Sequence, residues 1–544
     1  MEQNKNKKRI WLGILALIGL LCANLVYLLT VWLASKYDKV TLDQFIYQMK
    51  SSAAGANRSL AKSAWVRVGV YGLIYTFVEV LIYFIISGKL RKLLHDNKVY
   101  LKLCATKVCR FITMRALPLA LALLAISCTF FTLELDVVHY VKALATDSTF
   151  IEEEYVNPND VKITFPEKKR NLIYIFLESM EVAYADTEAG GPITDNFIPE
   201  LAQLAEDYIN FSHDDDLGGA QSFSGTTWTA AALVSQTSGV AVQVPLTAGR
   251  FGGTEEDSQF MPGIVTIGEV LEDAGYQQYF LMGSDSDFGG RDTYFTKHGN
   301  YEILDTKALK AAGRLPEDYR KWWGFEDKKL WEYAKEELTR LSESDQPFNF
   351  TMLTCDSHFP NGYRCEDCGK EYNKKYPNVL HCCSIKVLEF INWCKQQPFY
   401  ENTTIVLCGD HLTMDPKFFA DVNPDYQRTI YNCIINAPVD PINEKNRVFG
   451  TFDMFPTTLG ALGVEIEGDR LGLGTNLFSE TPTLAEQYGF DYVDYELQKN
   501  SDYYNSKFLD MYEMPLKQEE DETTGTSTTG SVPSTGTSVP ATTN

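Results

Sequence analysis

The sequence predicts an α/β protein in which three N-terminal membrane spans precede a mostly parallel sheet covered by helices on both faces. Three apolar stretches, at 10–34, 65–87 and 111–134, each reach the ~20 residues that a membrane-spanning helix needs. Beyond residue 170, apolar runs such as NLIYIFLE alternate with amphipathic ones such as IPELAQLAEDY. Near-continuous apolar strands alternating with helices are typical of a parallel sheet buried on both faces.

Length and charge narrow the classes of function. The chain has 544 residues, several times the modal domain of ~100–150 residues, so it can hold more than one structural unit. Of the net charge of −23, residues 1–110 carry +12 (17 Lys and Arg against 5 Asp and Glu), which leaves −35 for the rest. Because so acidic a body repels phosphates, we expect no nucleic-acid partner.

The first apolar stretch is expected to be a retained anchor, because it is longer than the ~7–15 residues of a signal-peptide core and no small-residue cleavage site follows it. Basic residues lie before the first span and between the second and third. They are Lys5, Lys7, Lys8 and Arg9, then Lys89, Arg91, Lys92, Lys98, Lys102, Lys107 and Arg110. The positive-inside rule puts both groups in the cytoplasm and everything after about residue 135 outside the cell.

The loop at 36–64 is expected outside the cell, yet it contains five Lys and Arg, which the positive-inside rule does not favour there. It also contains the amphipathic stretch LDQFIYQM, which we expect to lie on the outer membrane surface. Arg67, Glu79 and Arg115 lie in or near the spans, where a charge is costly. Snorkelling to the interface or pairing between helices is favoured for them over contact with a lipid headgroup.

The expected organisation has four parts. Residues 1–135 form the membrane anchor, 136–169 a linker and 170–512 the catalytic domain. The Ser/Thr/Gly-rich residues 513–544 have almost nothing to bury and are expected to be a disordered tail.

Polar side chains follow several predicted strands, where open α/β sheets bind their ligands. Glu178 follows IYIFL, Asp356 and His358 follow FTMLTC, and Asp410 and His411 follow TIVLCG. Carboxylates and an imidazole meeting at one sheet edge are suitable ligands for a divalent cation.

A hydroxyl nucleophile is expected in GGAQSFSGTTWTAAALVSQTSG, where Ser, Thr and Gly precede a run of helix formers. A helix N-terminus favours a phosphoryl oxyanion, and a metal would activate the hydroxyl. The alternative is that Thr226, Thr227 and Thr229 only cap this helix.

The segments NLIYIFLESME, GGAQSFSGTTWTAAALVSQTSG, TCDSHFPNGY, TIVLCGDH and FDMFPTTLGALG occur in this order over about 170–480. Together they resemble the membrane-anchored phosphoglycerol transferases of the sulfatase/alkaline phosphatase superfamily. That group includes lipoteichoic acid synthases, but the motifs GTTWT and DSHFPNGY are more similar to the branch that decorates envelope glycans. The sulfatase sequence Cys-x-Pro-x-Arg is missing, which argues against sulfate-ester hydrolysis.

The resemblance implies an alkaline-phosphatase/sulfatase-like domain with a metal held by Glu178, Thr226, Asp410 and His411. It implies Thr226 as the nucleophile, preferred over Thr227 because the family's threonine precedes an x-Trp-Thr stretch. The metal it implies is Mn²⁺, and these ligands would also accept Mg²⁺ or Zn²⁺.

Two further residues match positions that contact the substrate phosphate in the family. Arg291 in SDFGGRDTYF matches an arginine there, whereas Gly289 stands where the family has a tryptophan. His358 matches a histidine near the phosphate that could act as an acid or base. The alternatives are a surface Arg291–Asp292 pair and a strand-end His358 that hydrogen-bonds a neighbour.

The implied reaction moves glycerol phosphate from phosphatidylglycerol to a glycan or polyol-phosphate acceptor through a phosphoglyceryl-threonine, releasing diacylglycerol. A multi-pass protein of the cell membrane with an extracytoplasmic catalytic domain would suit this reaction. Phosphoethanolamine transfer, phosphodiester hydrolysis and a catalytically silent glycan- or lipid-binding protein are the alternatives, the last disfavoured because the metal set is intact.

The exported domain contains eight cysteines. We expect a disulfide to join the Cys365 and Cys368 loop to Cys382 or Cys383, with a zinc knuckle that includes His381 as the alternative. The other four cysteines lie within apolar runs, so we expect them to be buried thiols. They are Cys355, Cys394, Cys408 and Cys433.

Overall fold

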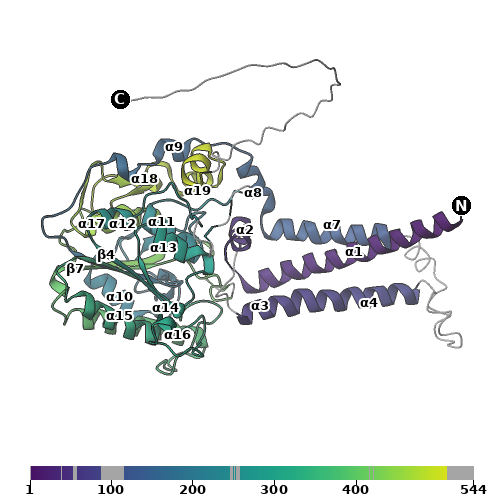
Figure 1. Ribbon diagram of the computed structural model, residues 1–544, viewed down its shortest axis with the longest axis horizontal. Coiled ribbons are helices and arrows are strands. Elements are labelled where there is room, and N and C mark those ends of the chain that lie inside the picture. The colour runs from purple at the N-terminus through teal and green to yellow at the C-terminus, as the bar shows by residue number, and fades with distance from the viewer. Residues whose placement is uncertain are drawn as a thin grey trace, which may run out of the picture.

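The computed structural model has two parts, a bundle of three long helices and a globular α/β body from which the bundle projects (Figure 1). It describes residues 2–37, 40–52, 58–86, 116–245, 249, 251–252, 258–415, 417–420 and 422–510. The expected tail at 513–544, Arg115 and the basic residues from Lys89 to Arg110 lie outside the described residues.

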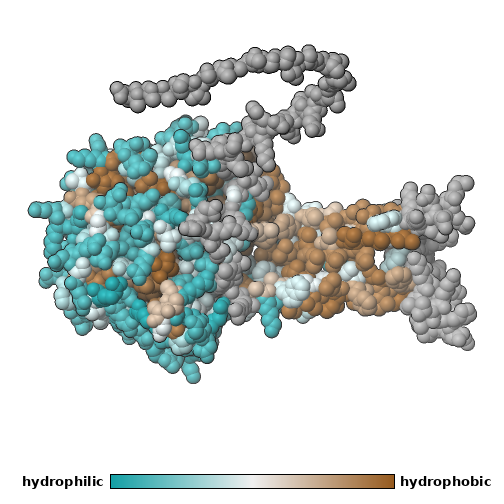
Figure 2. All heavy atoms as spheres, in the orientation of Figure 1, coloured by the Kyte–Doolittle hydropathy of each residue, from teal (hydrophilic) through white to brown (hydrophobic). Residues whose placement is uncertain are grey.

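The bundle contains three helices apolar and long enough to cross a membrane: Ile10–Lys36, Ser59–Ile85 and Ala116–Glu134. The first span lies in α1 (Glu2–Lys36) and the third is α7 (Ala116–Glu134). The second is a continuous helix made of α3 (Arg58–Ala64), the π-helix Trp65–Val70 and α4 (Tyr71–Ile86). Their outer surface is almost entirely hydrophobic, in contrast with the hydrophilic body (Figure 2). The three predicted spans are therefore present, and the second begins earlier than 65 because α3 runs into it.

A partly buried polar contact joins two of the spans. The amide of Asn24 in α1 donates to the carboxylate of Glu79 in α4 at 2.7 Å and to the hydroxyl of Thr76 at 3.0 Å. A side-chain amide is a low-cost partner for a polar group that faces apolar helices. Glu79 is thus engaged between helices, as expected.

The body is built on a seven-stranded sheet with the order β3-β8-β7-β2-β6-β4-β5. The five strands from β7 to β5 are parallel, and β8 and β3 join one edge antiparallel. The strands are β2 (Asn171–Leu177), β3 (Gly219–Ala220), β4 (Gln277–Met282), β5 (Glu302–Leu304), β6 (Phe348–Leu353), β7 (Thr403–Gly409) and β8 (Ile430–Ile435). The mostly parallel sheet is confirmed, with strands where the apolar runs predicted them.

Helices cover both faces of this sheet (Figure 1). Along β2, Tyr174 and Phe176 enter one hydrophobic core while Ile173, Ile175 and Leu177 enter the other, as alternation along a strand requires. The first core packs against α11 (Thr229–Ser238), α12 (Ile267–Asp273), α13 (Arg291–Lys297) and α17 (Met454–Ala461). The second packs against α10 (Pro199–Asp207), α14 (Thr306–Ala311), α15 (Asp327–Leu341) and α16 (Lys375–Cys394).

Short elements complete the body. Two small antiparallel pairs join β1 (Ile163–Thr164) to β9 (Glu465–Ile466) and β10 (Arg470–Leu471) to β11 (Gly474–Thr475). The region expected as a linker holds α8 (Val137–Leu144) and α9 (Phe150–Glu154), and Phe150 and Ile151 of α9 are core residues. The C-terminal helices are α18 (Leu484–Tyr488) and α19 (Phe490–Gln498), followed by the π-helix Tyr504–Phe508.

The amphipathic helix α2 (Leu42–Lys50) docks on the body rather than lying free on a membrane surface. Tyr47 is completely buried, its hydroxyl donates to the carbonyl of Gly289 at 2.6 Å, and its ring contacts Trp228 and Phe251. Lys50 donates to the carbonyl of Pro245 at 2.8 Å. The apolar face of α2 therefore serves protein packing, which corrects the expected role.

A buried ion pair fixes the segment that follows β2. Glu181 is fully buried and accepts two hydrogen bonds of 2.6 Å from Arg428 and one of 2.9 Å from the backbone N–H of Thr413. Replacing Arg428 by Ala should lower the free energy of unfolding by about 3 kcal/mol, because a buried carboxylate then lacks its cation. The measurement is the unfolding midpoint of the full chain in detergent.

A second substitution separates lost charge compensation from lost packing. Adding Glu181→Gln to Arg428→Ala removes the uncompensated charge and should recover part of the midpoint. A double variant no more stable than Arg428→Ala would contradict this account.

Candidate functional site

Four side chains converge at the carboxyl edge of the central strands. Glu178 directly follows β2, Asp410 and His411 directly follow β7, and Thr229 is the first residue of α11. The Nε2 atom of His411 lies 3.4 Å from Asp410 Oδ2, 3.7 Å from Glu178 Oε1 and 3.3 Å from the Thr229 hydroxyl. That hydroxyl donates to Glu178 Oε2 at 3.4 Å. Glu178, Asp410 and His411 therefore lie close together, as the sequence predicted.

The cluster is short of positive charge. Glu178, Asp410 and His411 are at most 3% exposed, and Asp410 Oδ2 is buried without a hydrogen-bond partner. Burial and the nearby Asp410 raise the pKa of Glu178 well above its usual range. An orphaned carboxylate oxygen beside a second carboxylate and an imidazole nitrogen fits a divalent cation, whose charge would keep both acids ionised.

Hydrogen bonds orient the side chains of Glu178, Asp410 and His411, which could bind a metal ion. His411 Nδ1 lies 2.8 Å from the carbonyl of Leu412, an acceptor, so the proton belongs on Nδ1 and the Nε2 lone pair faces the carboxylates. Ser179, in the left-handed region with φ of 51°, donates its N–H to Asp410 at 2.7 Å and its hydroxyl to Glu178 at 2.8 Å. Ser179 joins both carboxylates, and no pattern in the sequence singled it out.

The threonine brought to the cluster is Thr229, not Thr226. Thr226 is completely buried and its hydroxyl donates to the carbonyl of Phe223 at 2.8 Å, whereas Thr229 lines a pocket. The turn just before Thr226 needs Gly225, since its φ is 76° and a Cβ there would come within 2.7 Å of the Val242 carbonyl. Trp228 is the N-cap of α11 and no side chain caps this end, so capping does not explain these threonines.

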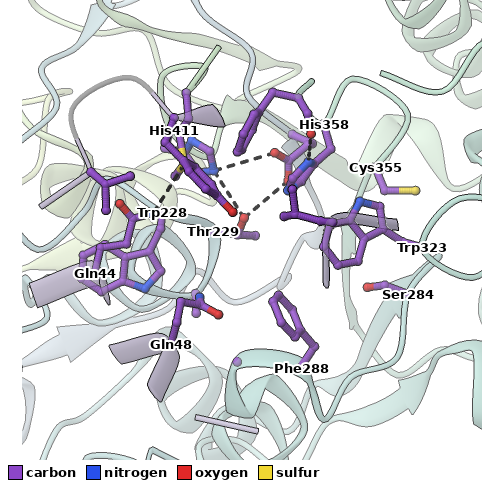
Figure 3. A pocket seen from close by; sticks show the side chains of 18 of the residues that line it. Gln44, Gln48, Trp228, Thr229, Ser284, Phe288, Trp323, Cys355, His358 and His411 are labelled. Carbon is purple, nitrogen blue, oxygen red and sulfur yellow. Dashed lines mark hydrogen bonds and ion pairs between the residues drawn. The ribbon is translucent and has the colours of Figure 1, made fainter. Parts of the chain in front are cut away.

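These side chains lie in a cavity of about 340 Å³ between the body and the membrane-side helices. Figure 3 shows Thr229 and His411 at its centre, with Gln44, Gln48 and Trp228 on one side and Trp323 and Ser284 on the other. The membrane-side wall comes from α1, α2, α3 and the chain between α1 and α2. Its members are Trp32, Leu33, Tyr37, Val40, Gln44, Phe45, Gln48, Leu60 and Ala61.

Arg291 and His358 both line this cavity, as the sequence predicted. Arg291 is not a surface residue: it is 7% exposed, and Phe288, Ser284 and Asp285 accept hydrogen bonds from its Nε and Nη2. His358 Nδ1 lies 2.6 Å from the carbonyl of Phe359. Burial, reinforced by the positive charge of Arg291, lowers the pKa of His358 to about 4, so the imidazole is neutral at pH 7.

Gly289 offers no aromatic ring to the cavity, but three other side chains do. Trp323, Phe288 and Trp228 line the cavity, and Trp323 packs on His358 with ring centroids 4.8 Å apart. The indole N–H groups of Trp228 and Trp323 are buried and, among the described residues, have no acceptor. In the sequence, Trp228 and Trp323 stand out only as aromatic residues near other motifs, so no pattern identified them as part of the site.

Asp356 turns away from the cavity. Asp327, at the start of α15, accepts the backbone N–H groups of Cys355 and Asp356 at 2.8 and 3.0 Å. Burial raises the pKa of Asp327 to about 6 and that of Asp356 well above its usual range. Asp327 therefore anchors the segment that leads to His358.

The cysteines differ from expectation in one respect. Cys355, Cys394, Cys408 and Cys433 are buried thiols, as predicted. In the described part of the chain Cys365, Cys368, Cys382 and Cys383 are also free, so the expected disulfide is not present. Of these, the sulfurs of Cys365, Cys368 and Cys382 lie within 4.8 Å of one another, and Cys383 is not part of this group.

Comparison with known proteins places this site in a family. The family model described as sulfatase matches residues 170–464. Phosphoglycerol transferase I of Escherichia coli (strain SMS-3-5 / SECEC) is 32% identical over 327 residues, or 58% of this chain and 40% of that protein. The Shigella flexneri protein of the same name is 31% identical over 328 residues, with the same coverage. The chain thus spans about 40% of the length of these curated relatives.

Two solved structures are similar to the body. A protein of the alkaline phosphatase superfamily from Vibrio parahaemolyticus is 21% identical with a TM-score of 0.45, covering 60% of this chain and 74% of that one. The lipoteichoic acid synthase LtaP from Listeria monocytogenes is 19% identical with a TM-score of 0.44, covering 61% and 80%. Because the sulfatase model matches more than half of the chain and includes the whole Glu178, Thr229, Asp410 and His411 cluster, the protein belongs to the sulfatase family.

Proposed function

We propose that the protein is a phosphotransferase that moves glycerol phosphate from phosphatidylglycerol to a hydroxyl of an envelope glycan or polyol-phosphate acceptor. One observation carries this proposal: a single cavity has Thr229 and the carboxylate cluster at its centre and the ends of membrane-spanning helices as its wall. A lipid donor held by its acyl chains in the bilayer could present its phosphate to Thr229 there. The relatives named phosphoglycerol transferase I support glycerol phosphate as the transferred group.

The first step would be attack by Thr229 Oγ1 on the phosphorus of the donor. A bond forms between Oγ1 and phosphorus, the bond from phosphorus to the diacylglycerol oxygen breaks, and phosphoglyceryl-threonine results. The threonine proton can pass to Glu178, whose Oε2 accepts the hydrogen bond of the hydroxyl at 3.4 Å. Diacylglycerol takes up a proton and leaves toward the bilayer.

The second step would be attack on this phosphorus by a hydroxyl of the acceptor, which restores Thr229. His358, neutral at pH 7 because burial lowers its pKa to about 4, could accept the proton of the attacking hydroxyl. Arg291 and the unpaired N–H groups of Trp228 and Trp323 supply donors for the phosphate and glycerol oxygens.

A divalent cation held by Glu178, Thr229, Asp410 and His411 would lower the hydroxyl pKa and offset negative charge on the phosphoryl group. The family implies Mn²⁺, and the mixed oxygen and nitrogen ligands would also take Mg²⁺ or Zn²⁺. We further propose that the body faces the outside of the cell, where a glycan acceptor would be found.

Thr229→Ala should abolish transfer, with a loss on the order of 10⁴-fold or more, because no nucleophile remains. The measurement is diacylglycerol release from phosphatidylglycerol, together with the intact mass of the protein. Wild type should gain one glycerol-phosphate unit and Thr229→Ala none.

Thr226→Ala is the matched control, since the same substitution three residues away removes a hydroxyl bonded only to a backbone carbonyl. It should keep the adduct and most of the activity. If Thr226→Ala loses the adduct and Thr229→Ala keeps it, the assignment of the nucleophile is wrong.

His358→Gln should separate the two steps. Loss of the base should slow transfer to the acceptor by about 10²–10⁴-fold while leaving formation of phosphoglyceryl-threonine. The adduct should therefore accumulate in His358→Gln during turnover. An adduct that forms as slowly as the product would instead assign His358 to the first step.

The membrane-side wall can be tested through the length of the donor's acyl chains. Phe45→Ala removes apolar surface from the cavity and should raise KM for a long-chain donor about tenfold, with a smaller change for a short-chain, water-soluble donor. Met49→Ala, on the same helix but 73% exposed and outside the cavity, is the control and should change neither. Equal effects of Phe45→Ala on both donors would count against a lipid-binding wall.

A further inference from the structure

Three cysteine sulfurs meet beneath the segment that carries His358. Cys365 and Cys368 lie on the loop that follows β6, and Cys382 lies on α16. The Cys365 sulfur is 3.5 Å from that of Cys368 and 3.7 Å from that of Cys382, and all three lie within 4.8 Å of one another. Each residue is at most 9% exposed.

These distances fit metal coordination better than a covalent bond. A disulfide brings two sulfurs to about 2.0 Å and can use only two of the three thiols. Zinc binds thiolates at about 2.3 Å in a tetrahedron, which sets neighbouring sulfurs about 3.8 Å apart. The separations of 3.5 and 3.7 Å are close to this edge length.

The chemistry of the thiols agrees with the geometry. Two thiols spaced Cys-x-x-Cys on a loop plus one from a helix is a common arrangement of zinc ligands. Soft thiolate donors prefer zinc to Mn²⁺ or Mg²⁺, so this site differs in kind from the Glu178 cluster.

We propose that Cys365, Cys368 and Cys382 bind one zinc ion, separate from the metal of the candidate active site. The fourth position is left to water, because no further His, Cys, Asp or Glu among the described residues joins the three within 4.8 Å. His381, a zinc ligand in the sequence-based alternative, instead lies 3.4 Å from Glu200.

The zinc would clamp the loop after β6 to α16. Residues 359–374 contain no helix or strand, yet they directly follow His358, whose ring lines the cavity. A cross-link from Cys365 and Cys368 to Cys382 would limit the movement of this loop. Loss of the metal should therefore reduce stability and disturb the position of His358.

The first test is zinc content of the full chain purified in detergent without chelator. Cys382→Ser should lose one zinc per chain relative to wild type, and Cys365→Ser should do the same. Cys383→Ser is the matched control, because it changes the next residue of the same helix and leaves the three ligands intact. Both classes of variant keep the Glu178 cluster, so any zinc bound there cancels in the comparison.

A second test uses unaltered protein and does not depend on how the variants fold. Titration of wild type with an organomercurial should release one zinc as the thiols react, detected with a colorimetric zinc indicator. Peptide mapping without reductant should find no disulfide among these cysteines. Equal zinc in Cys382→Ser, Cys383→Ser and wild type, or no thiol-releasable zinc in wild type, would overturn the proposal.

Because these tests read zinc and not turnover, they can fail while the proposed transferase activity stands. The reverse also holds: a chain without transferase activity can still bind zinc at this site.

Discussion

Two acidic side chains held together in the protein interior are the constraint on which the site depends. Glu178 and Asp410 end neighbouring parallel strands, are almost fully buried and share Ser179 as a donor, but Asp410 keeps one oxygen without a partner. Folding alone would not favour such an arrangement, because burying like charges is costly. The sheet, the positive φ of Ser179 and the fixed ring of His411 together keep these ligands ready for a cation.

The same edge of the sheet meets the membrane-side helices. Tyr47 inserts between Trp228 and Phe251, so α2 is part of the hydrophobic core that supports α11 and Thr229. The spans are therefore more than a tether, since their ends and α2 complete the walls of the cavity. Removing them would expose Trp228 and open one side of the site.

Much of the fold could be predicted from the sequence because its signals are local. Apolar runs located the spans and the strands that end at the site, and the polar residues that follow those strands identified Glu178, Asp410, His411 and His358. The nucleophile needed more: Thr226 and Thr229 differ by three residues, and only the folded backbone shows that Thr229 begins α11 while the Thr226 hydroxyl bonds a backbone carbonyl. The role of α2 depends on contacts between distant segments, which periodicity and spacing do not encode. The spacing of the cysteines did predict that Cys365, Cys368 and Cys382 lie close together, but not that their thiols are free.

Under the proposed function, the docking of Tyr47 would also fix the height of the reaction above the bilayer. Its hydroxyl donates to the carbonyl of Gly289, two residues from Arg291, and its short helix α2 lies between the first and second spans along the chain. Thr229 is thus held at one level near the lipid surface and has little freedom to reach outward. A long polymer could be modified only where a hydroxyl comes down to that level, so the reach of the acceptor, and not of the enzyme, would determine which units along it are decorated.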